Sequence, residues 1–208
     1  MVIIVEGGSR GQTEGPTKKS DFFNSELRQA FHSLLKKAGV CTMPRIVVAG
    51  GRAQAYDRFQ TCTQNGENVV LLVDSEKAVP KEYNDKPWDF LKTFESWAWL
   101  EKLDNSHCHL MVQCMESWFF ADKEKLKQYY KNGFREKKLL KGPIEELSTD
   151  RIIESLENAT RECKTKKGYD KSRDSAKILR LLDPNLIKNQ SYWANRFFVF
   201  IKEMMGAE

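Results

Sequence analysis

Four stretches of the chain have the nearly unbroken apolar pattern of buried β-strands. They are residues 2–5 (VIIV), 46–49 (IVVA), 69–73 (VVLLV) and 110–115 (LMVQCM). The first three are rich in β-branched side chains, which is typical of strands that are covered on both faces in a parallel sheet. The pattern therefore predicts four strands in a mostly parallel sheet.

Helical periodicity fills the segments between these stretches. Asp21 is placed to cap a helix that Gly39 ends, and the apolar stripe of this helix consists of Phe23, Leu27, Phe31, Leu34 and Leu35. Residues 52–64 and 88–103 carry further helical patterns. The resulting β-α-β-α-β-α-β order predicts an α/β fold with right-handed crossovers and helices flanking the sheet.

The strand pattern stops at residue 115, and only helical patterns follow. They cover residues 116–131, 151–164, 173–182 and 190–205, with breaks at residues 142–143 (GP) and 183–184 (DP). We therefore expect a core over residues 1–122 and a helical, basic C-terminal appendage over residues 123–208 that packs on this core.

Composition narrows the class of protein. The chain has 208 residues, 40% of them hydrophobic, which suits a globular protein. No apolar run approaches the ~20 residues that span a bilayer, and the first residues lack the features of a signal peptide, so we expect a cytoplasmic protein without a membrane partner. The five cysteines form no C-x-x-C pair, which indicates free thiols rather than a zinc site.

Charge is unevenly distributed along the chain. Residues 1–122 carry 14 Lys and Arg against 16 Asp and Glu, whereas residues 123–180 carry 17 against 10. An acidic half followed by a basic segment suits an acidic metal site beside a surface that holds a polyanion. Solvated faces of Lys-rich helices would explain the same basic segment, and charge alone leaves both interpretations open.

Acidic residues stand where the predicted strands end. Glu6 follows the first stretch, Asp74 and Glu76 follow the third, and Glu116 follows the fourth. A single acid at such a position is more often a helix cap or a turn residue, and Glu116 would also suit a helix start. As a set, however, these acids should converge, because parallel strands end at the same edge and ligands bind there.

Converging carboxylates predict a divalent cation. Crowded carboxylates repel one another, and one or more must take up a proton unless a cation is present. Hard cations such as Mg²⁺ or Mn²⁺ prefer oxygen ligands. Such an ion activates water and stabilises the charge that develops on a phosphate. The candidate metal ligands are Glu6, Asp74, Glu76 and Glu116.

The acids of the first and third strands also resemble a known sequence pattern. Glu6 with Gly7, and Asp74 with Glu76, are similar to the TOPRIM domain of topoisomerases, bacterial primases and overcoming-lysogenization-defect nucleases, although Glu76 stands where that family usually has Asp. The likeness covers residues 1–122. It implies a TOPRIM-like (Rossmann-like) fold in which Asp74 and Glu76 hold the metal and Glu6 is a general acid/base or a further ligand.

A closer resemblance is to small TOPRIM-like proteins of prokaryotes that often accompany ATPases in anti-phage defence loci. It is carried by residues 5–8 (VEGG), 71–76 (LLVDSE), 109–122 (HLMVQCMESWFFAD), 168–171 (GYDK) and 181–184 (LLDP). This resemblance implies nuclease action on DNA or RNA in antiviral defence and a partner ATPase.

Several other residues are candidates for contacts with the phosphate backbone. Residues 50–52 (GGR) end the second strand, where glycines and a helix N-terminus suit a phosphate, although an ordinary turn would look the same. Lys171 is a candidate catalytic cation, and a solvated loop is its alternative. The expected nucleic-acid-binding set is Arg52, Lys164, Lys166, Lys167, Tyr169 and Arg173.

Histidine and tryptophan residues of the middle segment are more readily explained by packing. His107 and His109 flank Cys108, but no further ligands accompany them, so we expect a buried structural role. Trp88, Trp97, Trp99 and Trp118 could stack on bases, yet aromatic residues at helical spacing are more often core or partner surface.

The sequence therefore predicts a nuclease that depends on Mg²⁺ or Mn²⁺ and cleaves phosphodiester bonds. Its catalytic candidates are Glu6, Asp74, Glu76, Glu116 and Lys171. The alternative is a non-catalytic, TOPRIM-like adaptor of a partner ATPase, with the Trp-rich segment 88–118 and the aromatic C-terminal helix as its interface.

Overall fold

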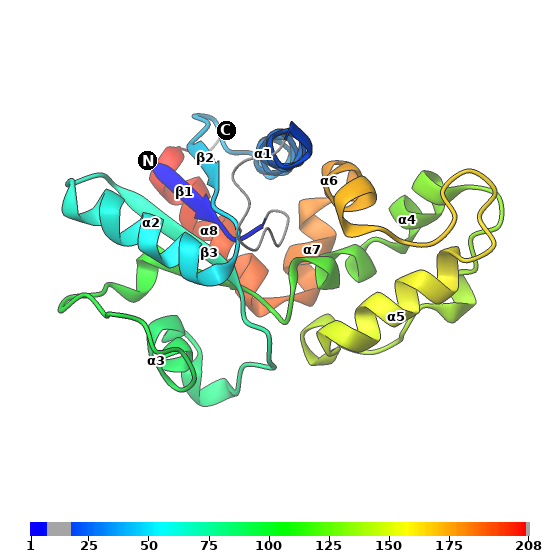
Figure 1. The fold of residues 1–208 in the computed structure, drawn as a ribbon. Helices are drawn as coiled ribbons and strands as arrows, with labels where there is room; N and C mark the ends of the chain where they lie inside the picture. The colour runs from blue at the N-terminus through cyan, green and yellow to red at the C-terminus, as the bar shows by residue number, and fades with distance from the viewer. Residues whose placement is uncertain (8–17, 207–208) are drawn as a thin grey trace.

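The computed structural model describes residues 1–7 and 18–206 (Figure 1). The strands are β1 (Val2–Val5), β2 (Arg45–Val48), β3 (Val69–Asp74) and β4 (Cys108–Met111). The helices are α1 (Lys18–Lys37), α2 (Arg52–Gln64), α3 (Pro87–Lys92), α4 (Lys123–Tyr130), α5 (Thr149–Thr160), α6 (Lys171–Leu181), α7 (Pro184–Gln190) and α8 (Tyr192–Met205). Short 3₁₀ helices are η1 (Lys81–Tyr83), η2 (Asn105–His107), η3 (Met115–Ala121), η4 (Glu136–Lys138) and η5 (Ile144–Glu146).

The four strands form one parallel sheet in the order β2-β1-β3-β4. The prediction of an α/β fold with a parallel sheet is confirmed. The chain leaves β1 toward the β2 edge and leaves β3 toward the β4 edge, so the direction of winding reverses between β1 and β3. The carboxyl ends of these two strands therefore border the crevice in which sheets of this kind bind ligands.

Helices cover both faces of the sheet. Successive side chains of a strand point to opposite faces, and the two faces pack into two separate hydrophobic clusters. One face, with Ile3 and Leu72, packs against α1 and α8, whereas the other, with Ile4 and Leu71, packs against α2 and α3. Both central strands are consequently buried along their whole length.

The fourth strand differs from its predicted bounds. It occupies Cys108–Met111, and residues 115–121 form the buried helix η3 instead of extending the strand. Pairing with β3 runs from the Leu71–Cys108 pair to the Asp74–Met111 pair and stops there. The prediction of a strand over residues 110–115 is therefore wrong, because a strand persists only as long as its neighbour supplies hydrogen bonds.

The predicted helix over residues 88–103 is also shorter than expected. Only α3 forms, and the chain after it carries Trp97 and Trp99 onto the side of α2. The Trp97 ring stacks on Tyr56 with a centroid separation of 4.3 Å. Packing of these large rings against α2 replaces the helix that the spacing predicted.

The C-terminal helices share a core with the sheet. One hydrophobic cluster extends from Ile3 to Ile201 and includes residues of α4, α5, α6 and α8. Helix α8 packs on β4, where Phe197 contacts the His109 ring, and Lys37 of α1 donates hydrogen bonds to the last carbonyls of α6. Residues 123–206 thus pack on the core as expected, and α8 completes the cover of one sheet face.

Two further observations concern the cysteines and the possibility of a membrane-spanning helix. All five cysteines lie within the described residues and are free, and four of them are buried. In residues 1–7 and 18–206, no helix is long and apolar enough to cross a membrane.

Candidate functional site

Glu6 and Asp74 meet at the crevice between β1 and β3. Glu6 directly follows β1, and its Oε2 accepts a hydrogen bond of 3.0 Å from the backbone N–H of Asp74. Asp74 ends β3, and its Oδ1 accepts one of 2.8 Å from the backbone N–H of Met115. Backbone donors of neighbouring elements therefore orient both carboxylates, each through one oxygen.

Glu76 lies on the same edge in a strained backbone conformation. Its φ of 59° falls in the left-handed region, which a residue with a long side chain rarely occupies. A hydrogen bond of 2.8 Å from its N–H to the Gln113 carbonyl holds this turn. The side chain is exposed and borders the same cavity as Glu6 and Asp74.

Glu116 reaches the site from η3 rather than from a strand end. Its side chain is 1% exposed, and Lys171 Nζ lies 3.3 Å from its Oε1. The same oxygen accepts a hydrogen bond of 2.9 Å from Tyr169 Oη, whereas the buried Oε2 has no partner among the described residues. Glu116 lines the same cavity as Glu6, Asp74 and Glu76, so all four predicted acids border one space.

A cavity of about 910 Å³ joins these residues. Its walls come from the carboxyl edge of the sheet, α1, the start of α2, one face of α5 and the start of α6. Its described lining contains eight carboxylates and one lysine, namely Glu6, Asp74, Glu76, Glu116, Asp150, Glu154, Glu157, Asp170 and Lys171. Figure 1 shows where α1, α2, α5 and α6, which carry these lining residues, lie around the sheet.

Glycines shape the floor of the cavity. Gly7 and Gly50 exchange two backbone hydrogen bonds, of 2.9 and 2.8 Å. A Cβ on Gly7 would lie 2.7 Å from the Leu27 side chain, and Gly50 has a φ of +76°. Only glycine fits both restraints, so Gly7 and Gly50 keep the ends of β1 and β2 close together beneath the carboxylates.

Burial dominates the electrostatics of the two central acids. Desolvation raises the pKa of Glu6 to about 7, although Arg52 and the Asp74 N–H act in the opposite direction. Desolvation also raises the pKa of Asp74 well above its usual range, and the neighbouring Glu6 adds to this rise. Both groups therefore favour a bound proton when no cation compensates their charge.

The structure does not direct Arg52 toward the cavity. Its guanidinium forms a 2.8 Å ion pair with Glu95 and donates a 3.2 Å hydrogen bond to the Asp74 carbonyl. Both partners are largely enclosed, and Arg52 is absent from the described cavity lining. These contacts hold Arg52 against the end of β3, whereas the sequence predicted that Arg52 contacts nucleic acid.

Tyr169 and Arg173 are likewise engaged inside the protein. Tyr169 is buried, and its hydroxyl binds Glu116. Arg173 pairs with the buried Asp174, and Tyr129 and Tyr130 donate to the same carboxylate. These contacts hold the start of α6 against α4, which is a structural use of two residues predicted to bind nucleic acid.

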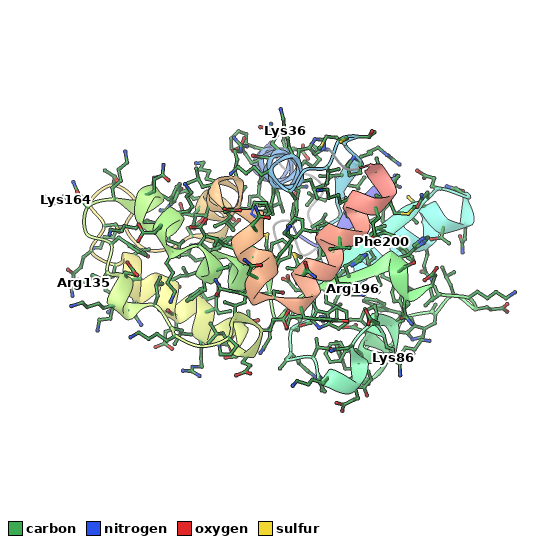
Figure 2. The ribbon with its side chains drawn as sticks, turned by 180° about the vertical axis from the view of Figure 1, so that it is seen from behind. Lys36, Lys86, Arg135, Lys164, Arg196 and Phe200 are labelled. Carbon is green, nitrogen blue, oxygen red and sulfur yellow. The ribbon has the colours of Figure 1, made fainter. Side chains whose placement is uncertain are left out.

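The three lysines predicted to hold the phosphate backbone lie outside the described cavity lining. Lys166 Nζ donates to the Tyr129 carbonyl and lies 3.3 Å from the centre of the Tyr129 ring. Lys164 and Lys167 are exposed, and Figure 2 shows Lys164 near Arg135 at one end of the molecule. The structure thus separates this basic end from the carboxylates.

The expected buried role is confirmed for His109 but not for His107, which is half-buried beside Phe200. His109 is fully buried beside Phe197 and Phe200, and its Nδ1 lies 3.0 Å from Arg196. Burial and then the Arg196 charge lower its pKa well below the usual range, so this ring is neutral. Trp88 and Trp118 are buried in the core.

The oxygen-rich lining fits a hard divalent cation by its chemistry. Among residues 1–7 and 18–206, no three Asp, Glu, His or Cys side chains stand close enough to form a ready-made metal site. Carboxylate oxygens are nevertheless the donors that Mg²⁺ and Mn²⁺ take, and the buried Oε2 of Glu116 needs a cationic or hydrogen-bonding partner. Side-chain rotation within the cavity would be needed to gather the ligands.

Sequence reasoning missed the acidic wall of α5. Asp150, Glu154 and Glu157 lie on one face of this helix and line the cavity opposite the sheet edge. Their spacing of four and then three residues places them on one helical stripe. The spacing of these acids is visible in the sequence, but which side of α5 faces the cavity depends on how the helix packs.

The structure thus defines an α/β protein with an acid-lined cavity at the switch point of a parallel sheet. The sequence profile of a family described as a domain of unknown function (DUF4276) matches residues 13–202, and the chain belongs to this family. The match includes Asp74, Glu76, Glu116 and Lys171 and begins after Glu6. No curated protein and no solved structure matches the chain.

Proposed function

We propose that the protein is a TOPRIM-like nuclease that uses Mg²⁺ or Mn²⁺ to cleave phosphodiester bonds in DNA or RNA. The observation that carries this proposal is the gathering of Glu6, Asp74, Glu76 and Glu116 around one cavity at the switch point of a parallel sheet. The setting implied by the sequence resemblance, a partner ATPase in anti-phage defence, is part of the proposal.

Asp74 and Glu76 would hold the metal, with Glu116 or Glu6 as a further ligand. The ion would supply positive charge to the phosphate and a more acidic bound water. Glu6 has a second use, because a carboxyl with a pKa of about 7 accepts and returns a proton near neutral pH. Its hydrogen bond from the Asp74 N–H fixes Oε2, and among the described residues Oε1 has no hydrogen-bond donor and could take the proton.

The N-termini of α2 and α5 border the cavity, through Gly51 and Asp150. Neither Gly51 nor Ser148 caps its helix through a side-chain hydrogen bond. The Gly51 N–H is itself bound to Gln54 Oε1, so the backbone N–H groups that follow it would be the donors for a ligand. A phosphate would thus find donors opposite the carboxylates that hold the metal.

The decisive experiment compares wild type with Glu6→Gln on DNA and total RNA, with Mg²⁺ or Mn²⁺, and with and without the protein encoded beside it. Glu6→Gln retains the acceptor for the Asp74 N–H but removes the ionisable proton. We expect cleavage to fall at least ~100-fold, the lower end of general acid–base catalysis. Glu82→Gln, an exposed position outside the described lining, is the matched control.

The adaptor alternative predicts a different pattern. An adaptor would keep its biological activity in Glu6→Gln and show no metal-dependent cleavage under any condition tested, and this pair of results would refute the nuclease. A circular-dichroism melt of each variant separates loss of chemistry from loss of fold.

A further inference from the structure

One cation stands among the carboxylates of the cavity. In the lining that the structure describes, Lys171 is the basic side chain that faces eight Asp and Glu side chains. Its Nζ lies 3.3 Å from Glu116 Oε1. Burial alone would lower the pKa of Lys171, but Glu116 and then Asp74 raise it above its usual range, so the ammonium form is held firmly.

The two members of this ion pair differ in their access to solvent. The Glu116 side chain is 1% exposed and that of Lys171 is 49% exposed. A buried carboxylate that loses its cation suffers the full cost of desolvation, whereas a half-exposed ammonium regains water when it moves away. Glu116 is therefore the fixed member of the pair and Lys171 the exchangeable one.

The local structure anchors the backbone of Lys171 and leaves its side chain mobile. Lys171 is the first residue of α6, which Asp170 caps through a hydrogen bond from Arg173 N. Tyr169 binds Glu116 through the same oxygen that attracts Lys171. The lysine ammonium is a point charge on a flexible four-carbon chain, so it can leave Glu116 without any change in the helix.

Building on the metal-dependent function proposed above, we propose that Lys171 is an exchangeable counterion that competes with the divalent cation. Its ammonium neutralises Glu116 in the metal-free protein and must leave this carboxylate when Mg²⁺ or Mn²⁺ enters the cavity. Lys171 thereby sets the cation concentration at which the site fills, and Glu116 is the residue through which this competition acts.

Calorimetric titration with Mn²⁺ at constant ionic strength tests the competition. Lys171→Gln removes the competing charge, and we expect Mn²⁺ to bind about tenfold more tightly, the effect of one unit charge near a divalent ion at a water-like dielectric. Lys171→Arg keeps the charge and should bind Mn²⁺ like wild type. Lys36→Gln is the matched control, because Lys36 is exposed on α1, outside the described lining (Figure 2).

A double-mutant cycle with Glu116→Gln shows whether Glu116 carries the effect. Once Glu116 is neutral, Lys171 is no longer held over the site, so Lys171→Gln should give little further gain in Mn²⁺ affinity. The same tenfold gain in both backgrounds would mean that Lys171 acts only through its general field. That outcome overturns a competition for Glu116.

The remaining outcomes separate this inference from the proposed function. Equal or weaker Mn²⁺ binding by Lys171→Gln overturns the competition but leaves a metal-binding site in place. No Mn²⁺ binding by wild type or any variant overturns the metal-dependent function and the competition with it. Melts in EDTA and in Mn²⁺ provide a second readout, in which Lys171→Gln should gain more thermal stability from Mn²⁺ than wild type does.

Discussion

At the scale of single residues, the site depends on carboxylates that the backbone holds in place. Glu6 accepts from the Asp74 N–H, and Asp74 accepts from the Met115 N–H. These bonds fix one oxygen of each group and couple the ends of β1 and β3 to the start of η3. Because both pKa values are raised by burial, proton and metal exclude each other at this site.

The first prediction concerns the pH dependence of metal binding. A metal ligand must be deprotonated, so Mn²⁺ affinity should rise as pH increases through about 7, the pKa of Glu6. Glu6→Gln should lose that part of the dependence. Calorimetry at several pH values measures it, and an identical pH profile in the two proteins would remove Glu6 from the metal equilibrium.

The same pKa shift has a consequence for stability. The folded-state pKa of Glu6, about 7, lies above the ordinary glutamate pKa of 4.5, so the folded protein binds an extra proton between these two pH values. The stability that this Glu6 proton contributes is therefore present below the unfolded-state pKa and is lost as pH rises toward 7. In EDTA, the melting temperature of Glu6→Gln relative to wild type should be higher at about pH 8 than at about pH 5; the opposite order would contradict the raised pKa.

Asp74 gives the second residue-scale test of the metal. We expect Asp74→Asn to weaken Mn²⁺ binding at least about tenfold, because a hard cation loses a charged ligand. The amide oxygen still accepts from Met115 N, so the loop keeps its anchor. The metal-free variant should melt no lower than wild type, since one of several repelling charges is gone; equal Mn²⁺ affinity would place Asp74 outside the site.

At the scale of elements, the sequence predicted the first three strands and the helices α5, α6 and α8 to within a few residues, but not the bounds of β4. Runs such as VIIV and VVLLV identify buried strands because nearly every position is apolar. The end of β4 could not be predicted, because it depends on where β3 stops supplying hydrogen bonds. The direction of the α5 acids and the internal roles of Arg52 and Arg173 depend on tertiary packing, which local spacing does not encode.

Helix α8 offers a test of how the sheet is covered. Phe197 is fully buried and packs against the His109 ring of β4. Its replacement by Ala should lower the free energy of unfolding by about 3–5 kcal/mol, because it opens a cavity in the core. Val199→Ala on the same helix, at a side chain 43% exposed, should cost far less. Urea unfolding that shows equal losses for both variants would contradict this packing.

At the scale of the whole molecule, charge is divided between two places. Carboxylates crowd the cavity, while Lys164 and its neighbours occupy the basic end seen in Figure 2. The amino-acid composition indicated both features but not their separation. A polyanion that reaches the cavity would meet Lys164, Lys166 and Lys167 only beyond the described lining, so these three lysines would serve binding and not the chemical step.

Neutralising Lys164, Lys166 and Lys167 together tests this division. We expect weaker binding of DNA and RNA across all sequences and a salt slope smaller by up to about two or three units. Because Lys166 is bound to Tyr129, a decrease nearer to two is expected. Single-turnover cleavage at saturating substrate should stay unchanged, and an unaltered salt slope would assign these lysines to a solvated surface.

Helix α8 is the last helix in the chain but packs on the sheet, and this has a consequence for the order in which the structure forms during synthesis. Chains emerge from the ribosome N-terminus first, so all four strands are synthesised before the helix that covers one of their faces. Lys171 and the acidic wall of α5 also follow the strand-end carboxylates in the chain. The cavity is therefore assembled only after most of the polypeptide has been released, and a nascent chain carries the strand-end acids without the helices that enclose them.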